Sequence, residues 1–482
     1  MLNRTQLYQT HVAAGATMVD FGGWEMPIQY PTGILEEHLF TRRHCSLFDV
    51  SHMGRLQISG PQALDFLQHV LTNNAQALTV GKAQYTLLAD EDGFAIDDAY
   101  LYRFNDRGYL LVVNAANREK DLKHLLEQLK AFDATLEDQT AATASIAVQG
   151  PEAKDILLRL SGGAPITEPI KNALNSVTLA GIPVRVSKTG YTGEPIGYEL
   201  FLDGTDAPRL WDLLVAEGAR PAGLGARDTL RTEACLPLYG HDLGTDAEGR
   251  GIPIYALSVA KFSVSFARQK GEFIGRAALA RQYEAYRRIM DRDFSDCQAL
   301  PRRVMPITLT GRGVMRAGFD VYKGDKKVGY VTSGTMIPYY VAQGEGIGTV
   351  FTEQTGKRSI GMAYLDSDVL TDDKVEVDIR GKRISAAVAP YHIRQDAPPY
   401  ARPILYGVEL EEEGDSQEAY VQRAVTLIGK AMDNHVWRQE ECINLIPSEM
   451  TPSRATRMLA ASDPAFRYAE HKKVKSFYDH EV

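Results

Sequence analysis

The chain has 482 residues, of which 44% are hydrophobic and 24% are charged, and 53 basic against 62 acidic side chains give a formal net charge of −9. These values are ordinary for a folded protein and suggest about three domains. The mild acidity argues against a nucleic-acid partner held by a basic face. No apolar run approaches the ~20 residues of a membrane helix, and MLNRTQLYQTH lacks the apolar core of a signal sequence.

The cysteine pattern excludes two further classes of protein. The four cysteines lie far apart in the sequence and form no C-x-x-C pair. They are Cys45, Cys235, Cys297 and Cys442. Neither a zinc knuckle nor a disulfide framework is indicated, so we expect no metal site and a reducing, cytoplasmic setting.

Residues 1–280 alternate strand and helix patterns, which is typical of mixed α/β structure. Residues 56–59 predict a strand, and Gly60-Pro61 then opens a helix whose apolar residues recur at helical spacing. The phrase LQISGPQAL, which begins at residue 56, is matched by IAVQGPEAK, which begins at residue 146. This recurrence indicates two related strand–turn–helix halves.

Between these halves the sequence predicts a hairpin and a following helix. The segments in chain order are strands over 82–88, 94–104 and 109–114 and a helix over 118–132. A tight turn at Asp92-Gly93 joins the first two strands. Asn117 stands where an N-cap residue should precede the helix.

The second hairpin strand, FAIDDAYLYRF, places one carboxylate on an aromatic face. Strand side chains alternate, so Asp98 shares a side with Tyr100, whereas Asp97 shares the other side with Arg103 and solvent. Apolar neighbours disfavour an ionised carboxyl, so we expect the pKa of Asp98 to be raised, as is common at functional sites. The alternative is a structural carboxylate hydrogen-bonded to the turn at residues 91–93.

A loop and a strand carry the next candidate residues. The loop over 190–193 presents Tyr191 between two glycines, which allow unusual backbone angles; alone, it is equally typical of a plain turn. Glu199 lies in the strand predicted over 198–202, where a glutamate usually faces solvent. Its functional interpretation is a two-point acceptor for adjacent N–H donors, such as the edge of a pterin or guanine ring.

Residues 223–238 open with GLGARD and predict an amphipathic helix. The segment has neither G-x-G-x-x-G nor a Walker lysine, so nucleotide binding is not indicated. Arg227 and Arg231 are four residues apart and share one helix face. The alternative for them is a pair of ion-paired surface arginines.

The composition changes in the C-terminal part. A charged helix over 285–300 precedes a β-rich stretch over 303–393, with glycine turns typical of a small antiparallel barrel or sandwich. Prolines within 398–403 and an acidic run over 409–413 indicate a linker. Residues 416–446 then predict an amphipathic helix.

Nine motifs follow one another along residues 1 to about 395. They are MVDFGGWEMPIQY (18–30), FDVSHMG (48–54), IDDAYLYRF (96–104), VVNAANREKD (112–121), VQGPEA (148–153), TGYTGE (189–194), GYEL (197–200), GLGARDTLRTEACLPLYGHD (223–242) and GYVTSGTMIP (329–338). In this order they resemble the T-protein, or aminomethyltransferase, family of the glycine cleavage system. The resemblance implies an α+β, α/β architecture: a three-domain ring in which two α/β pieces surround tetrahydrofolate and a C-terminal antiparallel β-barrel closes the ring.

The resemblance also implies a division of the chain and a reaction. We expect a folate-binding domain of two α/β pieces over 1–284, a barrel domain over 285–400 and a helical tail over 405–482. The family moves the aminomethyl group from the lipoyl arm of H-protein to tetrahydrofolate, which is a co-substrate, and releases ammonia. H-protein is therefore the expected partner, and no nucleic acid or membrane is.

Site residues carry over from the family motifs by position. Asp98, the second acid of I-D-D, matches the catalytic aspartate that the strand-face argument selects. Glu199 in G-Y-E-L matches a position that holds the pterin, and Arg227 in G-A-R-D matches one that contacts folate. The remaining matches line the pocket: Tyr85, Asn114, Tyr191 and, only loosely, Tyr400.

The sequence departs from the family pattern at three places, one of which is the end of the barrel, APYHIRQDAPPY, which only loosely matches the family's terminal folate contact. One extra residue stands between Tyr191 and the glutamate of G-Y-E-L, and residues 339–358 look inserted after S-G-T-x-x-P.

A second resemblance lies in the tail. Residues 437–453 and 467–471 resemble the N-terminal arm of serine hydroxymethyltransferase, and they match positions near that family's active site at Ser448, Tyr468 and Glu470. The lysine that binds pyridoxal phosphate and the large domain are missing, so we expect a truncated fusion without a pyridoxal phosphate site.

Two alternatives to aminomethyl transfer remain open at this point. Some relatives use the same scaffold as tetrahydrofolate-dependent demethylases of small methylated amines, sulfonium compounds or ethers. A folate-binding scaffold without turnover is the other alternative. No motif in the sequence indicates which residues of the pocket would contact the one-carbon donor.

Overall fold

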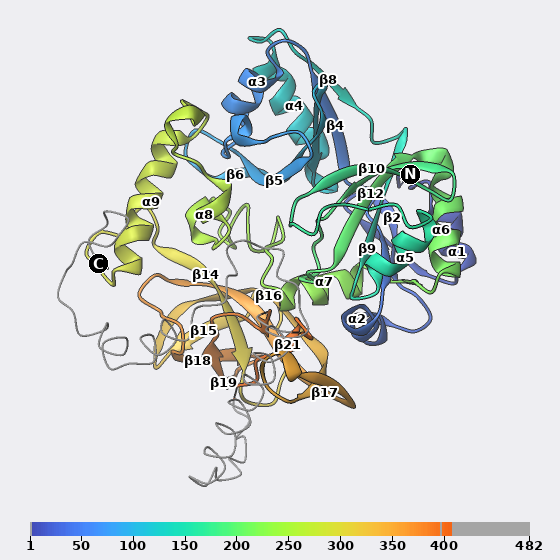
Figure 1. Ribbon diagram of the computed structural model, residues 1–482. Coiled ribbons are helices and arrows are strands. Elements are labelled where there is room, and N and C mark those ends of the chain that lie inside the picture. Colours follow the sequence, from blue (N-terminus) through green and yellow to red (C-terminus); the bar gives the residue numbers. More distant parts are fainter. Residues whose placement is uncertain (1, 396–397, 407–482) are drawn as a thin grey trace, which may run out of the picture. The chain divides into compact units, whose positions relative to one another are not determined.

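The structure is a computed structural model and describes residues 2–395 and 398–406 (Figure 1). The predicted hairpin lies in a five-stranded antiparallel sheet. Across this sheet the strands are β5 (Lys82–Ala89), β6 (Ala95–Asn105), β7 (Gly108–Val113), β4 (Gly54–Ser59) and β8 (Thr135–Asp138). Helices α3 (Ala63–Val70) and α4 (Arg118–Leu129) bury Phe66 and Leu125 in one core with Leu101 of β6. One side of β6 therefore faces the helices.

A second, six-stranded sheet carries the other half of the α/β part. Its strands are β10 (Leu174–Leu179), β11 (Ile182–Ser187), β12 (Gly197–Asp203), β9 (Thr143–Gln149), β3 (Ser46–Asp49) and β13 (Arg220–Pro221). All pairs are antiparallel except β3 with β13. Helices α5 (Ala153–Leu160) and α6 (Ala207–Ala216) cover it and bury Ile156 and Trp211 in its core.

The repeated strand–turn–helix phrase has the same local structure in both halves. β4 leads through Gly60 into α3, and β9 leads through Gly150 into α5. These glycines have φ angles of 113° and 130°, which other residues rarely adopt. A Cβ at Gly150 would also collide with the carbonyl oxygen of His44. The predicted repeat is therefore confirmed at the level of the turn.

The C-terminal part is a closed antiparallel barrel, as expected. Its strand order is β14 (Arg302–Leu309), β17 (Val350–Asp366), β16 (Lys326–Gln343), β15 (Asp320–Lys323), β18 (Lys374–Ile379) and β19 (Lys382–Val388). The barrel closes because β14 pairs with both β17 and β19. The mixed α/β class with a terminal barrel is thus confirmed.

Residues 339–358, which look inserted in the sequence, extend the β16–β17 hairpin. Tyr339 pairs with Gly356, and the ladder continues to the end of the hairpin. On this extension Glu353 forms an ion pair with Arg43 of helix α2 (Ile34–Arg43), at 2.5 Å. The extra residues therefore lengthen two existing strands and join them through a short 3-10 helix, Gly346–Gly348.

Two helices differ in extent from their predictions. The helix expected over 223–238 is α7 (Leu224–Glu233), and it ends before Cys235, whose φ of 56° is left-handed. The charged helix expected over 285–300 is α9 (Arg276–Met290), which begins earlier. The expected domain boundary at residue 284 falls inside α9 and stays a prediction.

A buried hydrogen bond and a buried ion pair attach the barrel to α7. Arg231 of α7 donates to the hydroxyl of Ser333 at 3.0 Å, and Glu233 pairs with Arg358 at 2.8 Å. All four side chains are less than 9% exposed. Much of the GLGARDTLRTEA motif therefore joins the α/β part to the barrel.

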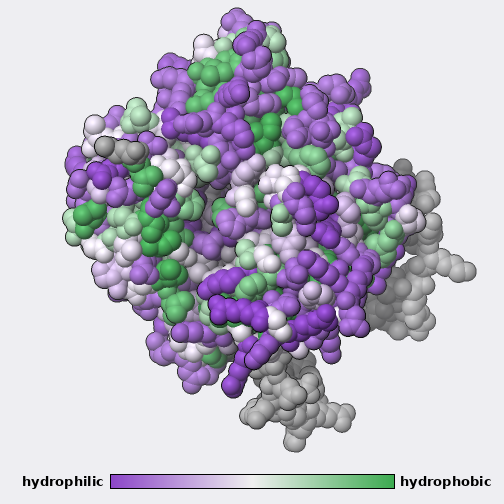
Figure 2. Space-filling view, turned by 180° about the vertical axis from the view of Figure 1, so that it is seen from behind, coloured by the Kyte–Doolittle hydropathy of each residue, from purple (hydrophilic) through white to green (hydrophobic). Residues whose placement is uncertain are grey.

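The remaining elements are short. They are α1 (Tyr8–Ala13), β1 (Thr17–Phe21), β2 (Trp24–Gln29), α2 (Ile34–Arg43), α8 (Ala260–Ser263), β20 (Ile393–Arg394) and β21 (Arg402–Pro403). On the face shown in Figure 2, hydrophilic and hydrophobic residues are interspersed. Among the described residues no helix is long and apolar enough to cross a membrane. The expected helix over 416–446 and the tail over 405–482 lie outside the described residues, apart from 405 and 406.

Candidate active site

Asp98 lies in β6 and is held by side chains from both neighbouring strands. Tyr85 of β5 donates its hydroxyl hydrogen to Oδ2 at 3.0 Å, and Asn114, just after β7, donates Nδ2–H to Oδ1 at 2.8 Å. Burial is the main cause that raises the pKa of Asp98 to about 7, and the negative charge of Asp97 is the second. A carboxyl with this pKa can gain or lose a proton near neutral pH, as acid–base catalysis requires.

The prediction that Asp97 meets Arg103 and solvent is wrong. Asp97 is 0% exposed, and Arg103 donates to the carbonyl of Leu78 instead. The alternation along β6 was predicted correctly. The error concerns which side of the sheet is covered, because α4 and the turn before it pack over the side that carries Asp97.

Three N–H groups donate to the Asp97 carboxylate. Its Oδ1 accepts from Nδ2 of Asn114 at 2.8 Å and from Nδ2 of Asn117 at 2.6 Å. Its Oδ2 accepts from the backbone N–H of Asn114 at 2.9 Å. Asn117 occupies the predicted N-cap position of α4, but its side chain makes no capping hydrogen bond and serves Asp97 instead.

The structural alternative for Asp98, a bond to the hairpin turn, is fulfilled by another residue. Asp90 accepts the backbone N–H groups of Asp92 at 3.0 Å and Phe94 at 2.9 Å. The turn is therefore held by Asp90, and the side chain of Asp98 accepts its hydrogen bonds from Tyr85 and Asn114.

Tyr191 connects Asp98 to Arg227. The guanidinium of Arg227 lies over the Tyr191 ring, 5.2 Å from its centroid, and the Tyr191 hydroxyl donates to the carbonyl of Pro237. Burial raises the pKa of Tyr191, and the charge of Asp98 acts in the same direction. Burial lowers the pKa of Arg227, while Glu199 and Tyr191 oppose this shift. The loop and α7 thus bring their candidates to the same place.

The two arginines predicted on one helix face have different roles. Arg231 is 2% exposed and forms a 2.7 Å ion pair with Asp242, besides its bond to the barrel. It is ion-paired as the alternative reading holds, but it is buried rather than on the surface. Arg227 remains half-buried over Tyr191.

Glu199 of β12 accepts hydrogen bonds at one of its two carboxylate oxygens. Its Oε2 accepts from the hydroxyl of Tyr102 at 3.0 Å and from the hydroxyl of Thr189. Within the described part of the chain, its Oε1 accepts no hydrogen bond. Since a carboxylate oxygen has two lone pairs, Oε1 is open to a ligand, whereas Oε2 would have to release a hydroxyl before it could accept as well.

Six of the seven predicted site residues are therefore linked by hydrogen bonds, ring contacts or charge. They are Tyr85, Asp98, Asn114, Tyr191, Glu199 and Arg227. Tyr400 is 37% exposed, and among residues 2–395 and 398–406 no hydrogen bond joins it to these six. Sequence reasoning missed the role of Asn117 as a partner of Asp97, for which the motif VVNAANREKD was the available signal.

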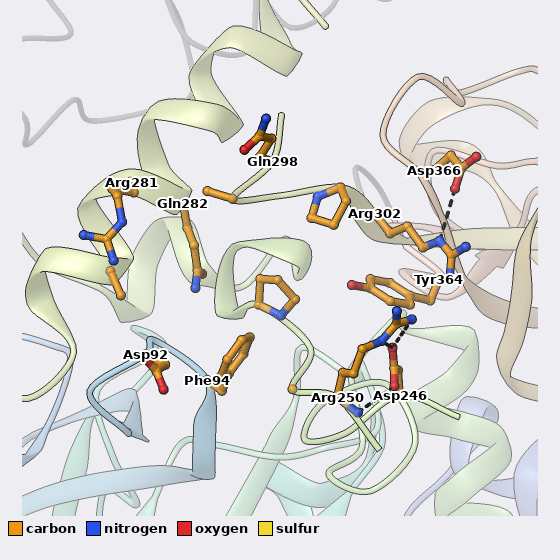
Figure 3. A pocket seen from close by; sticks show the side chains of 15 residues that line it. Asp92, Phe94, Asp246, Arg250, Arg281, Gln282, Gln298, Arg302, Tyr364 and Asp366 are labelled. Carbon is orange, nitrogen blue, oxygen red and sulfur yellow. Dashed lines mark hydrogen bonds and ion pairs between the residues drawn. The ribbon is translucent and has the colours of Figure 1, made fainter. Parts of the chain in front are cut away.

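The cavity shown in Figure 3 is distinct from this cluster. It measures about 540 Å³ and lies between the hairpin turn, α9 and the barrel. Its charged groups are largely paired, since Arg250 bonds to Asp246 and Arg302 bonds to Asp366. None of the seven predicted site residues lines it.

In the described residues no group of three or more His, Cys, Asp or Glu side chains could hold a metal ion.

Comparisons with known proteins agree with the geometry. Residues 7–249 match the GCVT N-terminal domain, and residues 302–392 match the glycine cleavage T-protein C-terminal barrel domain. An aminomethyltransferase of Geobacillus kaustophilus is 40% identical over 399 residues, which cover 81% of this chain and 98% of that protein. One from Bacillus cereus is 38% identical over 402 residues, with 81% and 97% covered. The crystal structure of glycine cleavage system aminomethyltransferase T from Bartonella henselae is 28% identical, with a TM-score of 0.67 and 84% and 100% of the two chains covered.

Proposed function

This chain belongs to the glycine cleavage T-protein family, and we propose that it is the aminomethyltransferase of glycine cleavage, acting on lipoyl H-protein with tetrahydrofolate as co-substrate. The observation that carries the proposal is the Asp98 carboxyl, poised to titrate near pH 7 between Tyr85 and Asn114. The products are 5,10-methylenetetrahydrofolate, ammonia and the free lipoyl thiol.

The residues of the cluster divide the work. The ionised Asp98 orients the folate amine, assists its proton transfers and stabilises positive charge that develops at the transferred carbon. Tyr85 and Asn114 fix the two oxygens of this carboxylate, so its direction is set before the substrate arrives. The expected effect of such a group on the rate is about 10²–10⁴.

The charge distribution fits tetrahydrofolate. Glu199 offers Oε1 to N–H donors of the pterin edge, and a carboxylate acceptor strengthens such bonds. Arg227 lies within electrostatic reach of Glu199 and is the second residue that we expect to contact folate. Tyr400 belongs to the proposal only through its position at the end of the barrel.

The location and the tail complete the proposal. We place the chain in the cytoplasm, where a folate-dependent glycine cleavage system would act. The segment that resembles serine hydroxymethyltransferase, including Ser448, Tyr468 and Glu470, lies outside the described residues. We propose that aminomethyl transfer does not need it.

A donor assay tests the function. The full chain is incubated with tetrahydrofolate and either aminomethylated H-protein or small methylated amines, sulfonium compounds and ethers. Methylenetetrahydrofolate and ammonia should form only with H-protein, and Asp98→Asn should lower turnover by about 10²–10⁴ while folate still binds. Turnover of a methylated small molecule, with none of H-protein, would establish the demethylase alternative.

A further inference from the structure

A third buried carboxyl lies behind Asp98 and Asp97. Asp121, in the first turn of α4, is 0% exposed and lies against Asp97 within hydrogen-bonding reach. Neither of its oxygens receives a hydrogen bond from the described residues. A buried carboxylate that accepts no hydrogen bond is strongly disfavoured as an anion, so this arrangement requires a proton.

The contacts indicate which carboxyl carries that proton. Asp97 accepts three N–H hydrogen bonds from Asn114 and Asn117, which stabilise its ionised form. Asp121 has no such donors, and two carboxyl groups in direct contact can bond only if one of them is protonated. The proton therefore resides on Asp121, which donates it to Asp97.

We propose that Asp121 is a positioning residue of this site: as a neutral acid it donates a hydrogen bond to Asp97 and so keeps Asp97 as the anion that acts on Asp98. The proposal deepens the proposed function, on which it rests for the role of Asp98. Asn114 transmits the arrangement, because its Nδ2 contacts Oδ1 of both Asp97 and Asp98 at 2.8 Å.

The surrounding charges are consistent with a neutral Asp121. Burial, and next the charge of Asp97, raise the pKa of Asp121 to about 10. Asp98 acts in the same direction, and Lys120 opposes it. Lys120 is exposed and donates to the carbonyl of Ile96 and the hydroxyl of Tyr239, so it is not bound to Asp121. At pH 8 Asp121 should thus remain protonated, unlike an ordinary aspartate.

Infrared spectroscopy of the full chain reads this proton directly. At pH 8 the wild type should show a C=O band of a protonated carboxyl that is missing from Asp121→Asn, in which an amide replaces the acid. Other buried acids, such as Glu37 and Glu194, cancel in the difference spectrum. Identical spectra of the two proteins in this region would overturn the proposal. Because the measurement needs no turnover, it separates failure of this inference from failure of the proposed function.

The pH profile of transfer then tests the coupling to Asp98. The rate should rise with pH as Asp98 ionises, and the midpoint of this rise is called the acid limb. Asp121→Asn keeps an N–H donor toward Asp97, so its acid limb should stay within about 0.3 pH unit of that of the wild type. Asp121→Leu removes the donor that faces the Asp97 carboxylate, so the acid limb should move relative to Asp121→Asn, by up to about one pH unit. Leu122→Ala, one residue along α4, controls for lost packing and should leave the limb in place. Equal limbs in Asp121→Leu and Asp121→Asn would refute the coupling.

Discussion

Removal of the Asp97 charge should shift the pH dependence of transfer. The ionised Asp98 is the active form in the proposed mechanism, so the rate of the wild type should rise with pH through a midpoint near 7. In Asp97→Asn the second cause of the raised pKa disappears, while burial remains. A nearby charge can shift a carboxyl pKa by about 1–3 units, and because burial is the larger cause here we expect the midpoint of the profile to move down by about one unit.

The size of the effect follows from this shift. At pH 6 the ionised fraction of Asp98 should rise from about one tenth to about one half, so the rate at pH 6 relative to pH 8 should rise about five-fold. The same substitution places an amide nitrogen against one of three N–H donors and should cost about 1–3 kcal/mol of stability.

The assay follows methylenetetrahydrofolate formation between pH 5 and 9, with folding checked by circular dichroism at each pH. The matched control is Asp90→Asn, which removes a charge from the same hairpin at its turn, away from the cluster. An unchanged acid limb in folded Asp97→Asn, or an equal shift in Asp90→Asn, would refute the electrostatic account of Asp98.

The remaining predictions concern folate binding, stability and the tail. Glu199→Ala removes the acceptor for the pterin edge and should weaken tetrahydrofolate binding by about 1.5–3 kcal/mol in calorimetry, with a smaller effect on the rate of the bound complex; unchanged affinity would exclude the pterin role. Glu233→Gln leaves Arg358 without its buried anion and leaves Arg42 with Glu194 alone, and it should destabilise the protein by about 3–5 kcal/mol in denaturant unfolding. Burial opposes ionisation of Glu233, but the charge of Arg42 together with His38 and Arg358 holds its pKa below the usual range. The stability difference between the wild type and Glu233→Gln should therefore shrink as the pH falls from the ordinary glutamate pKa toward the lower pKa of the folded protein. A stability difference that does not change with pH would contradict the ion-pair explanation. Deletion of residues 409–482 should leave transfer intact, because residues 1–408 form one compact unit; loss of transfer in a truncated protein that still folds would show that the tail takes part.

Local rules in the sequence predicted much of the fold. The period of two along β6 put Asp98 and Tyr100 on one side, and the structure has the same alternation. The Gly-Pro turns predicted both strand–helix junctions, since only glycine takes their φ angles without strain. The glycine-punctuated strands predicted the barrel. These features depend on residues close together in the chain, and so they can be read without the rest of the molecule.

The burial of the charged residues was decided by tertiary structure. Whether Asp97 meets water depends on α4, which packs over its side of the sheet, and strand alternation says nothing about which side is covered. Arg231 looked like a surface residue on an amphipathic helix, and the barrel, a hundred residues further on, buries it. Asn117 stands at the position of an N-cap, yet the nearby anion of Asp97 takes its amide. The sequence by itself thus determined which residues form the elements and which motifs they carry, whereas the pKa of Asp98 follows from desolvation and from a neighbouring charge, both of which exist only once distant segments have packed together.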